Sequence, residues 1–197
     1  MKAFEQLRTN EYLLKIFGSI LKIGNCMNAG NKNRGQADGY ELDALSKTFS
    51  IKDINGDSIM KTICNTIFEE DPKFADFKSQ FESCYAAYKC VIDDIKRDTE
   101  KAYKELKVTS NQFDLVKKMD PDVEDLQFGK QIQAFLEESD KLLQDTIKKN
   151  EEMDAKYKDT CDYFMLAASD ENRKKSEKFF KFWTDFVDDI AKVIPKP

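Results

Sequence analysis

Two stretches carry the most information in this chain: GNCMNAG at residues 24–30 and RGQADGYELDALSK at residues 34–47. The first is a run of small residues at the end of an apolar segment, and the second begins as a glycine-rich polar loop. Gly24 has no Cβ, so another backbone or a bulky side chain can approach it closely. Asn25 and Asn28 can bond exposed backbone groups, and the arginine of the second stretch can clamp the returning loop. The pattern is typical of a groove, but ordinary loop packing is an equally open interpretation.

Helical periodicity surrounds these stretches. Residues 3–28 are predicted to form one helix that is buried on more than one side. Residues 30–40 hold three glycines and are a predicted loop. A short helix is predicted over 42–49, and Asp57 is the predicted N-cap of a further helix over 58–70.

Two long helices are predicted next. The first runs over 72–107, about 50 Å of helix, and its apolar residues step by three and four from Phe74 to Ile95. Breaks fall within 107–125, and the second long helix covers 126–164. Because the connection between them is short, we expect an antiparallel hairpin.

Asn150 falls on the heptad seam of the second long helix. A polar residue there either fixes the register of the pairing or simply reaches water. The sequence leaves both alternatives open.

A last helix is predicted over 177–193, before Pro195. It carries a dense set of aromatic residues, Phe179, Phe180, Phe182 and Trp183. Such a set could form a ligand cage, but aromatic residues at helical spacing are far more typical of a core.

Composition excludes several kinds of site in this 197-residue chain. It has no histidine, which rules out histidine acid–base chemistry, histidine-containing triads and histidine metal sites within it. Its five scattered cysteines contain no CxxC pair and predict reduced, mostly buried thiols. A net charge of −5 does not suggest nucleic acid as a partner, and no apolar run approaches the ~20 residues of a membrane span. We expect a soluble cytoplasmic protein without cofactor or metal.

Two partial motifs fail. Gly30 begins a P-loop spacing, but Gln36 and Ala37 stand where lysine and serine or threonine are required. Residues 53–57 resemble the start of a calcium loop, but the glycine is misplaced and Cys64 occupies position 12. No acidic pair stands out as catalytic, so we expect a protein that is not an enzyme.

The two opening stretches resemble the signature of the formin homology-2 family. That signature is Gly-Asn-x-x-Asn, then Arg-Gly-x-Ala-x-Gly-Phe-x-Leu and a following Leu-x-Lys, and the chain matches nearly every position, with Tyr40 for the usual Phe. Further similar segments are Asp57–Phe68, the tripeptide Asp162-Tyr163-Phe164 and the pair Phe179-Phe180. The resemblance covers 1–194 and is specific over 17–47.

The resemblance implies an all-α, elongated helical domain with a long-helix antiparallel coiled-coil hairpin and a globular helical post. Residues 1–70 and 165–197 correspond to the post, and 71–164 to the coiled coil. The chain is then the C-terminal part of one formin homology-2 domain, without the lasso, the linker and most or all of the knob.

In this family two subunits form a head-to-tail ring, in which each lasso encircles the other subunit's post. The resemblance therefore implies a lasso-binding pocket lined or supported by Gly24, Asn25, Asn28, Arg34, Gly35, Gly39 and Tyr40. It implies actin as a partner, with Lys73, Asp76 and Lys78 as candidate contacts. Asp76 departs from the family, because a basic residue usually stands there.

Two functions follow as hypotheses. In the longer protein the chain belongs to a cytoskeletal module that nucleates actin filaments and binds their barbed ends as a ring dimer. Alternatively it is a helical scaffold with the formin architecture but little actin activity, as Asp76 would permit. Because the lasso is missing, we expect the chain alone to be a monomer or a weak dimer.

Overall fold

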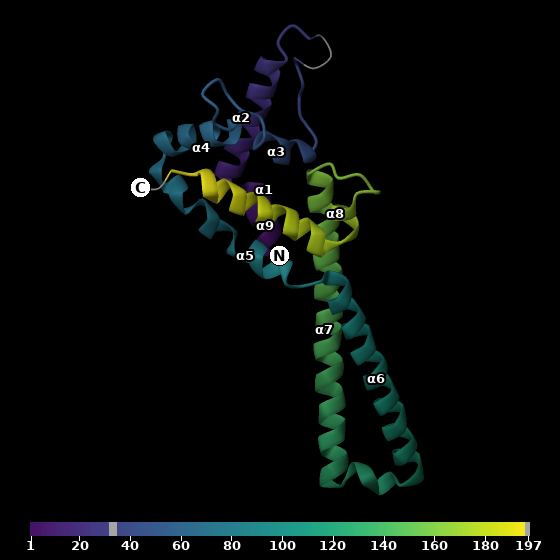
Figure 1. Cartoon of the computed structure of the whole chain (residues 1–197). Helices are drawn as coiled ribbons and strands as arrows, with labels where there is room; N and C mark the ends of the chain where they lie inside the picture. The colour runs from purple at the N-terminus through teal and green to yellow at the C-terminus, as the bar shows by residue number, and fades with distance from the viewer. Residues whose placement is uncertain (32–34, 196–197) are drawn as a thin grey trace. The chain divides into compact units, whose positions relative to one another are not determined.

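The computed structural model describes residues 1–31 and 35–195, and helices dominate it (Figure 1). In chain order the α-helices and the 3₁₀ helices (η) are α1 (Lys2–Thr9), α2 (Glu11–Met27), α3 (Asp43–Thr48), α4 (Ile59–Glu70), η1 (Pro72–Phe81), α5 (Glu82–Tyr88), α6 (Ile92–Met119), η2 (Pro121–Glu124), α7 (Gln127–Tyr163), α8 (Glu171–Lys174) and α9 (Ser176–Val193). The described residues form no strand, only one isolated bridge between Lys52 and Ser58. The predicted all-α fold is confirmed. None of the helices in the described part of the chain is both long and apolar enough to cross a bilayer.

The chain divides into two compact units. Met1–Cys90 and Tyr157–Pro197 form the first unit, and Val91–Lys156 form the second. The sequence predicted boundaries at 71 and 164, so the structure moves residues 71–90 and 157–164 into the globular unit. The packing of the residues after Pro72, described below, explains this difference.

The core of the first unit is built around α9. Phe179, Phe180 and Trp183 are each at most 2% exposed. The Trp183 ring centroid lies 4.6 Å from that of Phe164, just after α7, and 6.1 Å from that of Phe17 in α2. The aromatic residues of α9 therefore form a core and not a ligand cage.

The predicted single helix over 3–28 is wrong at Asn10, where the chain breaks between α1 and α2. The Asn10 backbone is extended, and its side-chain oxygen accepts a hydrogen bond from the Leu13 amide at 2.9 Å. Its amide nitrogen donates to Gln80 Oε1 at 2.6 Å. Asparagine competes with the helical backbone in this way, so it favours a cap over a helix interior.

We expect Asn10→Ala to lower the free energy of unfolding by about 1–2 kcal/mol, because it removes both the cap of α2 and the bond to Gln80. Asn10→Asp is the matched control, since it keeps an acceptor for the Leu13 amide and should lose less. Denaturant unfolding followed by circular dichroism measures both variants. Equal losses in the two would show that the cap contributes nothing.

The start of α4 also differs from the prediction. Ser58, not Asp57, is the N-cap, because its hydroxyl accepts from the Lys61 amide at 3.2 Å. The Asp57 carboxylate instead accepts from Lys61 Nζ at 2.8 Å.

The predicted continuous helix over 72–107 is wrong. The chain forms η1, α5 and α6 in turn, leaves the helix at 89–91, and then stays helical to Met119. Phe74, Phe77 and Phe81 are 0% exposed, with successive ring centroids 5.3 and 4.9 Å apart. Residues spaced by three and four positions thus place these rings in the globular core. The same spacing is expected for the seam of a hairpin, so the sequence does not distinguish the two.

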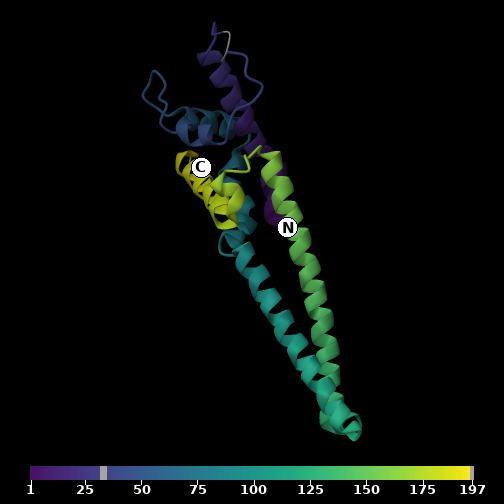
Figure 2. The same cartoon turned by 90° about the vertical axis from the view of Figure 1, so that its right-hand side faces the viewer.

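The second unit pairs α6 with the part of α7 up to Lys156, and Figures 1 and 2 show the two helices running antiparallel. Buried α6 residues recur every seven positions, at Ile92, Thr99, Leu106 and Phe113. Asn150 of α7 donates to the Thr99 hydroxyl oxygen at 3.0 Å. This bond ties one position of α7 to one position of α6, which favours the register role for Asn150 over simple hydration.

A glycine fixes the turn of this hairpin. A Cβ on Gly129 would lie 1.9 Å from the carbonyl oxygen of Val123, which is closer than any side chain tolerates. The start of α7 can therefore approach η2 only because residue 129 is glycine. No spacing or motif in the sequence indicates that this glycine matters.

Candidate partner-binding site

A hollow of about 250 Å³ lies beside the C-terminal end of α2, in the first unit. Its walls come from α2, from the returning loop that follows it, and from α3 to α4. The lining residues are Ile20, Leu21, Ile23, Gly24, Asn25, Met27, Asn28, Ala37, Gly39, Tyr40, Ala44, Lys47, Thr48, Ile51 and Ile59. Most of them are apolar, so the hollow suits an apolar side chain better than a charged ligand.

Asparagine amides hold the loop against the helix. The Asn25 side chain donates to the Ala37 carbonyl and accepts from the Ala37 amide, both at 2.9 Å. The Asn28 side chain donates to the Gly24 carbonyl at 2.8 Å and so satisfies an end of the helix. The two Asn25 bonds position the loop as one wall of the hollow.

Glycines keep the site open and the loop tight. Ideal Cβ atoms on Gly24 and Gly39 would meet no other heavy atom within 4 Å, so both positions face open space. Gly35 is different, because a Cβ there would lie 2.6 Å from the Asn28 carbonyl oxygen. Gly35 lets the loop pass close to the end of α2, whereas Gly24 leaves room in the hollow itself.

Tyr40 separates this hollow from a second one of about 290 Å³. Its hydroxyl donates to the Phe17 carbonyl at 3.1 Å, and burial raises its pKa, so it stays a neutral hydrogen-bond donor. The second hollow is lined by Phe17, Gly18, Leu21, Gly39, Tyr40, Leu42, Tyr163, Phe164 and Met165. Leu21, Gly39 and Tyr40 thus border both hollows.

The predicted hollow beside Gly24 and Asn25 is present, and Asn28, Gly39 and Tyr40 line it with them. Gly35 is not among the lining residues, and Arg34 lies outside the described residues.

Sequence reasoning missed the wall from the far side of α3. Ile51 and Ile59 reach the hollow because the chain turns back at Gly56, and the Ile59 amide bonds the Ile51 carbonyl at 2.9 Å. The only available signal was the Asn55-Gly56 turn, which indicates that the flanking residues come together but not what they face.

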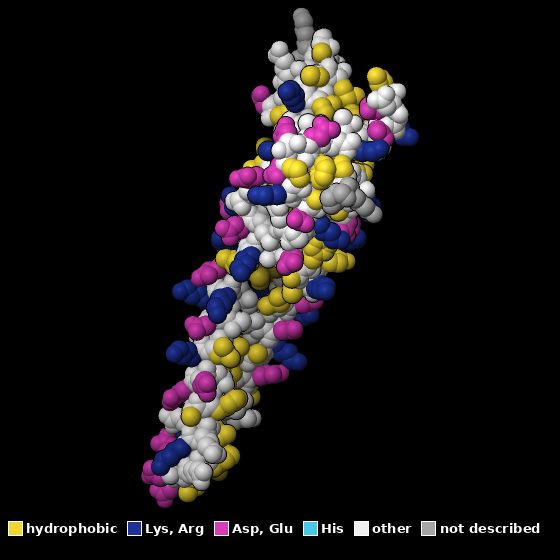
Figure 3. Space-filling view, turned by 90° about the vertical axis from the view of Figure 1, so that its left-hand side faces the viewer, with side chains coloured by type: hydrophobic (Ala, Val, Ile, Leu, Met, Phe, Trp, Pro, Cys, Tyr) yellow, Lys and Arg dark blue, Asp and Glu magenta, His cyan; other side chains and the backbone are white. Residues whose placement is uncertain are grey.

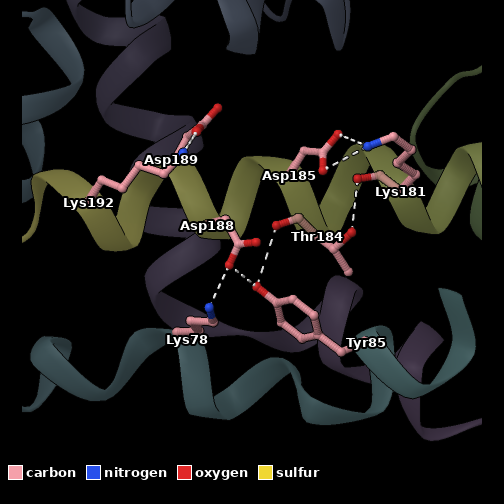
Figure 4. A network of polar contacts seen from close by, with 8 residues as sticks. All are labelled: Lys78, Tyr85, Lys181, Thr184, Asp185, Asp188, Asp189 and Lys192. Atoms are coloured by element: carbon pink, nitrogen blue, oxygen red, sulfur yellow. Dashed lines mark hydrogen bonds and ion pairs between the residues drawn. The ribbon is translucent and has the colours of Figure 1, made fainter.

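The candidate actin contacts lie apart from the hollow, on η1. Lys73 and Asp76 are exposed. Lys78 is exposed too, but it forms an ion pair with Asp188 of α9, with its Nζ 2.7 Å from the carboxylate (Figure 4). Its ammonium also lies 5.4 Å from the centroid of the Tyr85 ring. The structure therefore leaves Lys73 as the more available cation of the two.

Asp188 joins Lys78 to Tyr85, whose hydroxyl donates to the same carboxylate at 2.6 Å (Figure 4). Burial opposes ionisation of Asp188, but the hydrogen bonds from Lys78 and Tyr85 outweigh it and lower its pKa. Burial first, and then the bond to Asp188, raise the pKa of Tyr85. The network thus joins η1 and α5 to α9 and contributes to their packing.

We expect Asp188→Asn to lower the free energy of unfolding at pH 7, by less than about 1 kcal/mol because the pair is partly solvated. The pKa of Asp188 lies below 3.8 in the folded chain, so its contribution is present above pH 3.8 and is lost as pH falls through the folded value. The variant should therefore lose less stability than the unchanged chain on acidification. Urea titrations across the acid range test this, and parallel curves for the two proteins would contradict it.

The cysteines are unpaired thiols, and two of them, Cys26 and Cys90, are exposed. All five cysteines are free, and Cys64, Cys84 and Cys161 are buried. Burial raises the pKa of Cys64 and Cys84 to about 12, so neither is a thiolate at neutral pH. Among the residues that the structure describes, no group of acidic and cysteine side chains is arranged to hold a metal ion.

Comparisons with known proteins agree on one family. A family model described as Formin Homology 2 Domain matches residues 1–190. The chain is 28% identical to Formin-2 of Mus musculus, with 96% of the chain and 12% of that protein covered. It is 27% identical to Protein diaphanous of Drosophila melanogaster, with 94% and 17% covered. A shorter match, to Protein cappuccino of Drosophila melanogaster, is 50% identical with 24% of the chain and 4% of that protein covered. The chain thus spans only a small part of the length of these relatives.

Proposed function

The chain belongs to the Formin Homology 2 Domain family, and on that premise we propose that it is the partner-capturing part of an actin-assembly module. In the longer protein this module nucleates actin filaments and binds their barbed ends as a ring of two subunits. The chain supplies the receptor surface of that ring and performs no covalent chemistry.

The hollow beside Gly24 is the observation that carries this proposal. Residues of the family signature form part of its wall, it is mostly apolar, and Gly24 and Gly39 leave it open. Open apolar hollows of this kind mark sites where a partner inserts an anchor. We assign the anchor to the lasso of a second subunit, with the second hollow beyond Tyr40 as an extension of the same receptor.

A ring of this kind needs two complementary surfaces on each subunit, arranged head to tail. Residues 1–197 correspond in this proposal to the receptor surface alone, with the lasso elsewhere in the longer protein. The chain alone should then be a monomer or a weak dimer and should nucleate actin poorly, because holding several actin subunits together requires the ring.

Actin contact is assigned to the exposed part of η1, with Lys73 as its cation. Asp76 is also exposed there and weakens the local positive charge. That feature favours a second candidate function, a scaffold with the formin architecture and little actin activity.

Pyrene-actin assembly separates the two functions. The longer protein should accelerate assembly strongly, whereas residues 1–197 at the same concentration should not, and light scattering should show a dimer only for the longer protein. A well-folded longer dimer without effect on assembly would establish the scaffold. Strong nucleation by residues 1–197 alone would overturn the assignment of the lasso to another part of the protein.

A further inference from the structure

An apolar strip on α7 takes no part in the pairing of the hairpin. Phe128, Phe135 and Leu142 are spaced seven residues apart and are 63%, 58% and 67% exposed. Phe135 and Leu142 directly precede Leu136 and Leu143, which occupy the seam, so they point about 100° away from it around the helix. These three residues, called the α7 strip, form one continuous face of about 21 Å.

The α7 strip exposes enough apolar surface to bind a partner segment. Aromatic side chains carry about 150–250 Å² each, so three side chains at these exposures present on the order of 350 Å² of apolar surface. Met119 and Leu126, which precede the strip in the chain, are also exposed, at 86% and 54%. An exposed apolar patch of this extent is often functional. It is about half of what each partner buries in a standard protein interface, and so it suits a single helix.

The charge around the strip is strongly acidic. Residues 114–145, the distal half of the hairpin, contain nine acidic and four basic side chains, a net charge of −5. The proximal segments, 91–113 and 146–156, contain eight of each and are neutral. Figure 3 shows one face of the molecule, with acidic side chains and hydrophobic groups close together at the far end of the hairpin. All of the net charge of the second unit thus lies in the half that bears the strip.

Two of these carboxylates flank the strip directly. Glu138 and Asp145 follow Phe135 and Leu142 by three positions, so they lie beside them on the same side of α7. Within residues 1–31 and 35–195, neither carboxylate forms an ion pair. A partner can therefore use these charges without first breaking a contact.

We propose that the α7 strip binds a basic amphipathic helix of a partner protein. The apolar residues of that helix, at positions i, i+3 or i+4 and i+7, cover the strip, and its flanking lysines or arginines pair with Glu138 and Asp145. A second copy of this chain is disfavoured as the occupant, because two such ends would bring like net charges together. The strip lies in the second unit, so this inference does not depend on the hollow or on the function proposed for it.

Fluorescence anisotropy with labelled model peptides tests the proposal directly. The probe is a lysine/leucine amphipathic helix of about 18 residues, long enough to cover the strip. A glutamate/leucine peptide with the same leucine pattern is its control. Residues 1–197 should bind the basic peptide and not the acidic one. Phe135→Gln and the double variant Glu138→Gln/Asp145→Asn should each weaken binding about tenfold or more.

Matched variants control for hydrophobicity and charge. Ile54→Gln removes a side chain that is fully exposed in the other unit, and Glu151→Gln/Glu152→Gln removes two charges from the neutral proximal half of α7. Both should bind as the unchanged chain does, and circular dichroism should show every variant folded. Equal binding of the two peptides, or equal weakening by strip and control variants, would overturn the proposal. It would also fail if sedimentation showed self-association that Phe135→Gln abolishes, because a second copy would then be the occupant.

Discussion

Gly24→Leu should abolish capture of the second subunit while leaving the chain folded. A Cβ added at residue 24 would face open space, so the fold can accept a side chain there, but a leucine would occupy the hollow of about 250 Å³ to which we assign the anchor. Losing a central anchor costs about 3 kcal/mol or more, which is about a hundredfold in affinity. Sedimentation of the longer protein should show its dimer dissociating, and actin nucleation should fall with it.

Two further variants make this result specific. Lys22→Leu adds the same side chain to α2 at an exposed position outside the hollow, so it should keep the dimer. Gly24→Ala adds only a methyl group, so its effect should be intermediate. If the Gly24→Leu dimer were as stable as the unchanged one, the anchor would bind elsewhere, and Gly18→Leu in the second hollow would be the next variant to test.

Trp183→Ala should have the largest effect on stability. Its side chain is fully buried, and its ring lies against those of Phe164, Phe179 and Phe186. Truncating a buried tryptophan costs about 3–5 kcal/mol, a large share of the 5–15 kcal/mol that holds a domain together. We expect the first unit to unfold at a much lower denaturant concentration, or not to fold at all at 37 °C.

Trp183→Phe is the matched comparison. The indole Nε1 is buried and has no hydrogen-bond partner among the described residues, so replacing the ring with phenyl removes an unpaired donor as well as some volume. Its loss should be well below that of the alanine variant. Urea unfolding measures both variants, and similar losses would mean that the size of the buried ring contributes little.

Periodicity predicted element type well wherever a single face was buried. The helix over 126–164 and the last helix were placed almost to the residue, because their apolar residues keep one spacing for several turns. The prediction of one long hairpin helix after Pro72 was wrong, because Phe74, Phe77 and Phe81 have the same spacing but are buried in the globular core. The predicted helix through Asn10 was wrong for another reason. The Asn10 side chain caps α2 through a local bond to the backbone, and periodicity does not detect such a bond.

The candidate site was predictable only in part. Gly24, Asn25 and Tyr40 could be found because they belong to a recognisable signature, and they do line a hollow. Ile51 and Ile59 could not, since their place on the opposite wall depends on how the chain returns after α3. Gly129 was missed because its importance comes from one close contact with a backbone carbonyl in η2.

The bond between Asn150 and Thr99 constrains how this hairpin can evolve. The Thr99 hydroxyl also donates to the Ile95 carbonyl at 2.7 Å, so losing Asn150 first still leaves that hydroxyl bonded. Losing Thr99 first removes the acceptor of a half-buried amide, which is the costlier step. We therefore expect Asn150 to be replaced before Thr99 in evolution. Related proteins with an apolar residue at position 99 should also lack asparagine at position 150, and proteins that keep Asn150 without Thr99 should be rare.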